Sequence, residues 1–143
     1  MKPMIFDKID HTTICKRYVR NKVYTGKATC HPNDYDFESK LVGENYAYSR
    51  SLIAELCDDR DAKLEQLKVL RHVYSILEQN NKCDLNSEEA YVVRRQITVT
   101  ERDLRSTRDL IKLMRLELRN TIAGRDKMYA RLREIRKNQG ISH

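Results

Sequence analysis

The longest regular pattern in the chain is an apolar repeat over residues 90–135, and it constrains the fold more than any other feature. A repeat of about 3.5 residues keeps one face of a helix directed at a partner, as in a coiled coil, and no proline interrupts this one. At about 1.5 Å per residue the helix would be roughly 70 Å long, so we expect an elongated, oligomeric protein. The repeat positions are Ala90, Val93, Ile97, Thr100, Leu104, Thr107, Ile111, Met114, Leu118, Thr121, Arg125, Met128, Leu132 and Ile135.

Polar residues interrupt the apolar character of this repeat. Three repeat positions carry threonine, and Arg125 takes an inner position directly after Gly124. A charge at a core position is costly unless it is paired or solvated. One interpretation is that these residues set the register or lie near a frayed helix end. The other is a cavity in which Gly124 allows a close approach and Arg125 points at an anion.

Length and composition indicate one domain over residues 1–143. The chain is 40% hydrophobic and 34% charged, which is typical of soluble helical proteins rather than disordered ones. It has neither an apolar run long enough for a membrane span nor a secretory signal, so we expect no membrane partner and a cytoplasmic location. The four cysteines are scattered singly, which argues against a zinc site or a disulfide framework.

The net charge of +7 is distributed in three blocks. Residues 1–33 carry a net +5, residues 34–85 a net −4 and residues 86–143 a net +6. An acidic segment between two basic ones suggests that the middle of the chain pairs with its neighbours partly through charge. The remaining basic surface is available to an anionic partner.

The N-terminal residues predict β-structure. Residues 12–19 and 23–30 are rich in β-branched and aromatic side chains and are separated by the polar turn of residues 20–22. This pattern indicates a β-hairpin within residues 1–30, to which residues 4–6 can add a third short strand. Because so few strands are marginal alone, a helix or a second subunit should cover one face.

Two long helices should follow. The first is expected over residues 34–79, with Asp34 or Asp36 as its N-cap, and the second over residues 86–137, with Asn86 or Ser87 as its N-cap. Gly140 and a polar tail should end the second helix. The fold class is therefore α+β, mainly α: a β-hairpin and two long antiparallel, coiled-coil-like helices.

No motif for catalysis is recognisable, so we expect a non-catalytic protein without a cofactor. The chain has no nucleophile elbow, no glycine-rich phosphate loop and no paired-cysteine or HExxH metal motif. His31, Asp34 and Asp36 could be assembled into a metal site, but such residues in a turn more often cap a helix.

The arginines indicate a binding site more strongly than the possible metal ligands do. Most of them interleave with acids along residues 94–136, which is typical of a solvated face and argues against a long DNA-binding surface. The exception is Tyr129, which is close in sequence to Arg125, Arg131 and Arg133. An aromatic ring with several guanidinium groups can stack on a base and hold its phosphates.

A resemblance to a known family rests on short motifs. His31-Pro32-Asn33-Asp34, Phe37-Glu38-Ser39, Gly43 and Arg50 resemble a pattern of small phage and prophage proteins, as do residues 94–97 and 129–136. On these residues the chain resembles the phage anti-Thoeris sponges over about residues 27–137. Those proteins sequester the cyclic ADP-ribose-type signal that bacterial TIR-domain defence enzymes make.

The resemblance implies a phage protein of the host cell cytoplasm, a homo-oligomer that binds a small cyclic nucleotide near a subunit interface. The residues that it implies for the ligand are Lys27, His31, Asp34, Phe37, Arg125, Tyr129, Arg131 and Arg133. Residues 31–37 would supply one wall, although this loop is acidic and has no arginine; Lys27 is the nearest cation. The alternatives are a nucleic-acid-binding protein, a partner-binding coiled coil and a direct inhibitor of a host enzyme.

Overall fold

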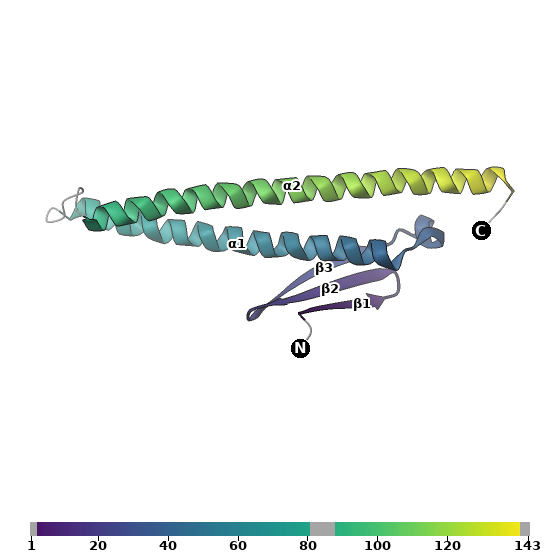
Figure 1. The fold of residues 1–143 in the computed structure, drawn as a ribbon, viewed down its shortest axis with the longest axis horizontal. Coiled ribbons are helices and arrows are strands. Elements are labelled where there is room, and N and C mark those ends of the chain that lie inside the picture. The colour runs from purple at the N-terminus through teal and green to yellow at the C-terminus, as the bar shows by residue number, and fades with distance from the viewer. Residues whose placement is uncertain (1–2, 81–87, 141–143) are drawn as a thin grey trace. The chain divides into compact units, whose positions relative to one another are not determined.

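A computed structural model describes residues 3–80 and 88–140 (Figure 1). The elements follow in the order β1 (Met4–Ile9), β2 (Thr12–Val19), β3 (Lys22–Thr29), the 3-10 helix η1 (Pro32–Phe37), α1 (Lys40–Gln79) and α2 (Glu88–Asn138). The expected class, mainly α with an N-terminal sheet and two long helices, is confirmed. Over the described residues, neither helix contains a stretch apolar enough to span a membrane.

The chain divides into two compact units. The first comprises residues 1–55 and 113–143, and the second comprises residues 56–112. Both long helices contribute to both units, so the expectation of a single domain stays a prediction. Each unit is described by itself below.

The sheet of the first unit has three antiparallel strands in the order β1-β2-β3 (Figure 1). Ile9 pairs with Thr12 and Val19 pairs with Lys22, so each connection is a two-residue turn. The first turn residues, Asp10 and Arg20, have φ values of 54° and 56°, as tight hairpin turns require. The third strand at residues 4–6 is confirmed and extends to residue 9.

One face of the sheet packs against α1 through small side chains. Cys15 and Ala28 are buried against Ala47, and the Cys15 thiol donates to the Ser51 hydroxyl at 3.8 Å. Gly26 lies opposite Ala47 and Ser51, where a Cβ atom would overlap the α1 backbone. Residues this small allow the strand and the helix to approach closely, which fixes the position of α1 on the sheet.

The first long helix begins later than predicted. Residues 32–37 form η1, in which His31 Nδ1 accepts the Asn33 N–H at 3.1 Å. The Ser39 hydroxyl then accepts the Val42 N–H at 3.3 Å, so Ser39 takes the capping role expected of Asp34 or Asp36. The expected start at residue 34 is therefore wrong, because a separate 3-10 turn precedes the helix.

The second helix is described from Glu88 to Asn138, close to the predicted 86–137. Its expected N-caps, Asn86 and Ser87, lie outside the described residues. Gly140 follows the helix with a φ of +73° and donates its N–H to the Lys137 carbonyl at 3.1 Å, as the predicted glycine stop requires.

The apolar repeat on α2 does not keep one buried face to residue 135. From Ala90 to Leu118 every member of the repeat is buried or half-buried. Beyond it, Thr121 is exposed, and Met128, Leu132 and Ile135 are 41%, 37% and 44% exposed. The inward positions become Ile122, Arg125, Tyr129, Arg133 and Arg136. A straight helix has 3.6 residues per turn and drifts by about 20° per heptad relative to a 3.5-residue repeat, so within one chain the buried face of α2 leaves the repeat after Leu118. The expectation that the whole repeat faces a partner stays a prediction.

The second unit contains the remaining parts of the two helices. Lys63 of α1 donates to Asp59 at 2.7 Å and to the Thr107 hydroxyl of α2 at 2.9 Å. Thr107 also donates to the Asp103 carbonyl at 3.0 Å. This polar residue of the apolar repeat is therefore hydrogen-bonded rather than open to a ligand. Leu67 and Leu104 supply buried apolar contacts on the two helices.

Ion pairs in the first unit join the acidic middle of the sequence to both basic ends. This confirms the pairing expected from the charge blocks. The pairs are Lys8 with Glu38, Arg17 with Glu55, Arg133 with Asp34, and Arg136 with Asp36.

Candidate functional site

The first unit contains a cavity of about 230 Å³. Its walls come from the ends of β2 and β3, from η1, and from residues of α1 and α2 that belong to the same unit. Four of the residues expected from the sequence line it: His31, Asp34, Arg125 and Tyr129. The other four expected residues do not line the cavity: Lys27, Phe37, Arg131 and Arg133.

Phe37 lies behind Tyr129. The two rings are stacked with centroids 5.4 Å apart, and the Arg136 guanidinium lies 4.6 Å from the Phe37 ring centroid. Tyr129 and Arg136 are seven residues apart, a rise of about 10.5 Å on a helix, which places Phe37 between them. Phe37 therefore supports Tyr129, and Tyr129 is the ring that lines the cavity.

Arg133 is engaged by Asp34. The Arg133 guanidinium donates to the Asp34 carboxylate and, at 3.5 Å, to the Asn33 carbonyl. Asp34 is only 8% exposed, and a carboxylate so well buried needs a cationic partner. Arg133 thus holds η1 against α2 and neutralises an acid of the cavity wall.

Lys27 and Arg131 lie on other faces of their elements. Gly26 and Ala28 are the buried residues of β3, and strand residues alternate between faces, so Lys27 is directed away from α1. Its backbone carbonyl accepts a hydrogen bond of 2.6 Å from Arg50, which does line the cavity. Arg131 is exposed and lies about 200° around the helix from Tyr129.

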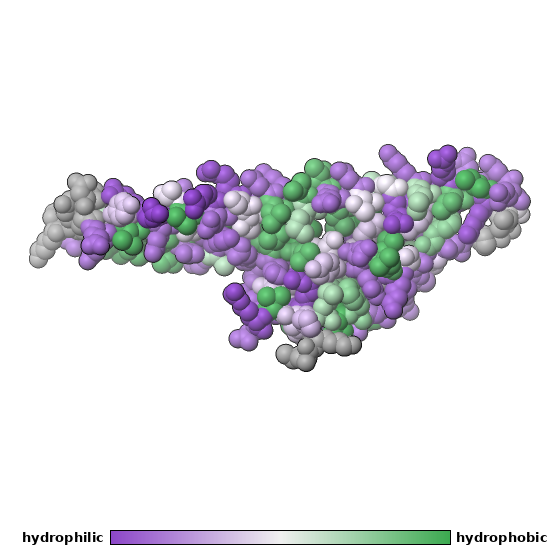
Figure 2. Space-filling view, in the orientation of Figure 1, coloured by the Kyte–Doolittle hydropathy of each residue, from purple (hydrophilic) through white to green (hydrophobic). Residues whose placement is uncertain are grey.

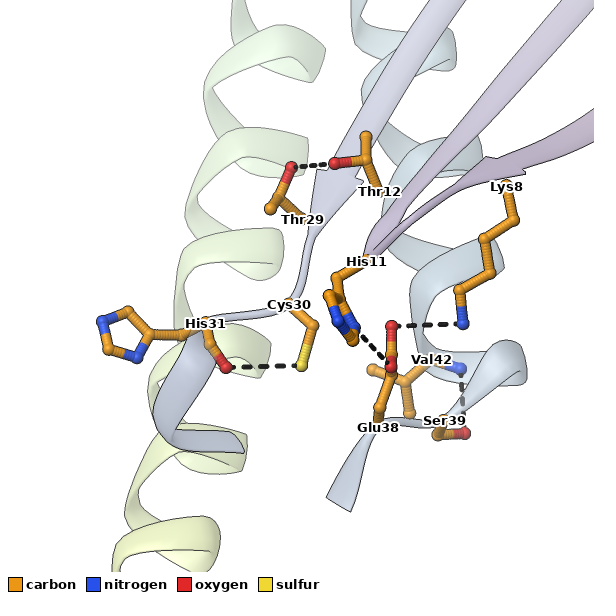
Figure 3. Close-up of polar contacts among 9 residues, drawn as sticks. All are labelled: Lys8, His11, Thr12, Thr29, Cys30, His31, Glu38, Ser39 and Val42. Atoms are coloured by element: carbon orange, nitrogen blue, oxygen red, sulfur yellow. Dashed lines mark hydrogen bonds and ion pairs between the residues drawn. The ribbon is translucent and has the colours of Figure 1, made fainter. Parts of the chain in front are cut away.

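Glu38 lies between two basic side chains (Figure 3). Lys8 is 3.1 Å and His11 Nδ1 is 2.9 Å from its carboxylate oxygens, and the His11 ring stacks on Tyr35 at 3.5 Å. The hydrogen bond with His11 is the largest cause that lowers the pKa of Glu38 below its usual 4.5, and Lys8 adds to the effect. Glu38 therefore stays ionised and has its charge matched within the chain.

Two other side chains of the wall have their pKa values raised by burial. The Tyr129 pKa is raised mainly by desolvation, and so is the Cys30 pKa, to which Glu38 and Asp34 also contribute. The Cys30 thiol lies 3.6 Å from the His31 carbonyl oxygen, and Figure 3 shows the His31 ring directed away from it. Both groups are kept in their neutral, hydrogen-donating forms.

Two donors of the cavity have no partner among the described residues. The Tyr46 hydroxyl is buried and makes no hydrogen bond there. The Arg125 guanidinium, within the same described ranges, is joined to no acceptor by a hydrogen bond or an ion pair. An unmet buried hydroxyl costs about 1–3 kcal/mol, but the Tyr46 oxygen is closed to solvent, so the half-buried Arg125 guanidinium is the group placed to receive an acceptor from a ligand.

Sequence reasoning identified Arg125 but missed Tyr46, Arg50, His11 and Glu38. Arg50 and Glu38 were visible only as members of a motif. His11 is in a turn, and it reaches the cavity because the strand pairing folds that turn back toward η1. Tyr46 follows Val42 by one helical turn, a spacing that could have indicated a shared face.

The cavity wall combines charged groups of both signs. Asp34 and Glu38 are paired, whereas Asp126 is exposed at the rim beside Arg125. Neither a hydrogen bond nor an ion pair joins Asp126 to Arg125 among the described residues. In the part of the chain that the structure describes, no group of three or more His, Cys, Asp or Glu residues could hold a metal ion.

Comparison with protein-family models, with curated proteins and with solved structures gave no match. The fold and cavity define a mainly helical α+β protein with a partly polar pocket in its first unit.

Proposed function

We propose that this chain binds a small nucleotide of the cyclic ADP-ribose type in the cavity of the first unit and sequesters it without cleaving it. The observation that carries the proposal is Arg125, which lines the cavity one helical turn before Tyr129 and has no hydrogen-bond or ion-pair partner among the described residues. A guanidinium with free donors suits the oxygens of a phosphate.

Tyr129 supplies a surface for the base. Its ring lines the cavity and is supported from behind by Phe37, so a flat ring can stack on it without a large loss of side-chain freedom. The His31 ring, whose Nδ1 is occupied by the Asn33 N–H, has Nε2 left to donate to a ligand.

The acidic wall is compatible with an anion because its buried carboxylates are paired. Arg133 holds Asp34, and Lys8 and His11 hold Glu38. In this proposal Arg133 acts through Asp34 and η1 rather than by gripping phosphate, and Lys27 and Arg131 make no contact with the ligand.

The proposal includes a second copy of the chain, which would complete the binding site. Ligand sites usually enclose about 300–1,000 Å³, so a cavity of about 230 Å³ encloses only part of such a nucleotide. Met128, Leu132 and Ile135 form an exposed apolar stripe on α2, and Figure 2 shows hydrophobic side chains reaching the surface between hydrophilic ones. Self-association through this stripe would cover it and add a wall, as the resemblance to anti-Thoeris sponges implies.

The same resemblance supplies the proposed setting, a phage protein that blocks bacterial antiviral defence in the host cytoplasm. Sequestration requires only affinity and abundance, because binding removes a signal by mass action. The exposed apolar stripe also favours a second candidate, a coiled coil that binds a partner protein and needs no small ligand.

Retention and release of cyclic ADP-ribose tests the proposal. Protein in excess should remove the nucleotide from an ultrafiltrate, and heating the retained protein should release the same molecule intact. Nucleotide left in the first filtrate would refute binding. Nucleotide that is retained but recovered as a different compound would refute sequestration without cleavage. A coiled coil that binds only a partner protein would leave the nucleotide in the first filtrate.

A further inference from the structure

The second unit has two sides that differ in charge. On its part of α2 the buried residues are spaced by three or four positions along one face: Ala90, Thr100, Leu104, Thr107 and Ile111. Successive residues of a helix are about 100° apart. The positions directly after the buried residues therefore form a row on one side of that face, and the positions directly before them form a row on the other side.

The two rows have different side chains. The row after the buried residues contains three cations and one acid: Tyr91, Glu101, Arg105, Arg108 and Lys112. The row before them contains two acids and no cation: Glu89, Val99, Asp103, Ser106 and Leu110. One side of α2 in this unit is therefore basic, and the other is apolar and acidic.

The first helix adds cations to the basic side. Arg71 of α1 donates to the Glu101 carboxylate at 3.5 Å, so Arg71 lies on the side of the row that contains Glu101. Lys68 directly follows the buried Leu67 and is three residues from Arg71, so the two cations share a side of α1. We call this surface the basic face. Its five cations are all exposed: Lys68, Arg71, Arg105, Arg108 and Lys112.

Acids neutralise only part of the basic face. Glu101 is matched by Arg71, and Asp103 belongs to the opposite row. Asp109 is exposed and lies about 70° around the helix from the mean direction of Arg105 and Arg108. Apart from Arg71, the cations of the basic face make no hydrogen bond or ion pair with another side chain among the described residues. Acids that alternate with arginines in the sequence are thus largely separated from them in space.

The cations of α2 are spaced for contact with a row of phosphates. Arg105 and Lys112 are seven residues apart, which is about 10.5 Å along the helix, and Arg108 lies between them. One strand of a nucleic-acid duplex presents a phosphate about every 3.4 Å along its axis, so this row spans about three phosphates. Guanidinium groups suit phosphate oxygens because their donors are paired and planar.

A duplex fits the basic face better than a single strand does. Single-stranded nucleic acid is usually held by aromatic rings on which its bases stack. Residues 105–112 contain no aromatic side chain. Cations that contact phosphates alone fix a duplex in place without reading its sequence.

We infer that the basic face of the second unit binds the phosphate backbone of double-stranded nucleic acid without sequence preference. This activity is additional to the sequestration proposed for the cavity of the first unit and does not depend on it.

The test is fluorescence anisotropy of a labelled DNA duplex of about 20 base pairs, titrated with the full chain at several salt concentrations. Four cations without a partner predict a slope of log K against log salt of about −3.6, which is a loss of about 100-fold in affinity between 50 and 200 mM salt. The triple variant Arg105→Gln, Arg108→Gln and Lys112→Gln should reduce the slope to about −0.9 and weaken binding at 50 mM salt by more than about ten-fold.

A matched control removes the same charge from exposed positions of α2 in the first unit: Lys127→Gln, Arg131→Gln and Lys137→Gln. It should keep the slope and leave the affinity within about two-fold. Circular dichroism checks that both triple variants keep their helices.

Four results would overturn the inference. The first is a wild type that does not bind the duplex at 50 mM salt, and the second is an equal loss in the two triple variants, which would show attraction by net charge alone. The third is tighter binding of the single strand than of the duplex. The fourth is displacement of the duplex by polyglutamate at an equal concentration of charge, which would show a surface for any polyanion.

Discussion

Gly26 of β3 lies directly against the backbone of Ala47 in α1, where a Cβ atom would overlap the Ala47 carbonyl and lie 2.5 Å from the Ser51 nitrogen. Gly26→Ala should therefore separate the sheet from the helix and lower the free energy of unfolding by about 3 kcal/mol or more. The midpoint of urea denaturation measures this effect.

Gly124 of α2 is the matched control. A Cβ atom there meets nothing within 4 Å among the described residues, so no close approach of the kind expected at this glycine occurs among them. Gly124→Ala should raise the free energy of unfolding by about 0.5–1 kcal/mol, because alanine restricts the unfolded chain more than glycine does. Equal effects of the two substitutions would contradict the packing described here.

The pairing of Glu38 with His11 and Lys8 predicts a loss of stability in acid. The folded-state pKa of Glu38 is lowered from 4.5, so its contribution is complete above pH 4.5 and is lost as the pH falls through the lowered folded-state pKa. Glu38→Gln should be less stable than the wild type at neutral pH and should lose less stability on acidification. The free energy of unfolding of both proteins is measured between neutral and acid pH. An equal fall in the two proteins would argue against this pairing.

The pair formed by Asp34 and Arg133 predicts a structural effect of the arginine. Arg133→Gln leaves a mostly buried carboxylate without its cation and should cost about 1–2 kcal/mol, a range lowered for the partial exposure of Arg133. Arg131→Gln, two residues away and exposed, should cost almost nothing. Adding Asp34→Asn to Arg133→Gln should recover part of the loss, and thermal unfolding of the set would show whether it does.

The strands and both helices could be predicted because their signals are local. Alternating β-branched residues and the long apolar repeat act within a few residues of each other. The start of α1 could not be placed, because Asp34, Asp36 and Ser39 all favour a capped turn, and only the contact of η1 with α2 selects Ser39. The rotation of the buried face beyond Leu118 likewise depends on what α2 packs against.

The candidate site was only partly predictable for a related reason. Arg125 and Tyr129 are four residues apart, so their shared face can be seen in the sequence. Arg133 and Phe37 were identified as ligand contacts, but the structure gives each a partner within the chain, Asp34 and Tyr129. Tyr46 reaches the cavity from another element, and no local pattern connects it with Arg125.

The exposed apolar stripe on α2 gives a prediction for self-association. Leu132→Glu places a charge in the middle of the stripe and should reduce the mass in solution to that of one chain, since a buried unpaired carboxylate opposes pairing. Light scattering during gel filtration provides the mass. Lys127→Glu, an exposed change on the same helix outside the stripe, should leave the assembly intact; a wild type that is already monomeric would contradict the proposal.

The most direct test of the central claim is the affinity of cyclic ADP-ribose for the wild type, Arg125→Gln and Arg131→Gln, measured by calorimetry at one salt concentration. Arg125 lines the cavity and lacks a hydrogen-bond or ion-pair partner among the described residues, whereas Arg131 is exposed on another face of α2. Arg125→Gln should weaken binding by about 10- to 100-fold, the value of a charge-assisted hydrogen bond, and Arg131→Gln should leave it within about two-fold. Equal losses in the two variants, or an unchanged affinity in Arg125→Gln, would contradict the account.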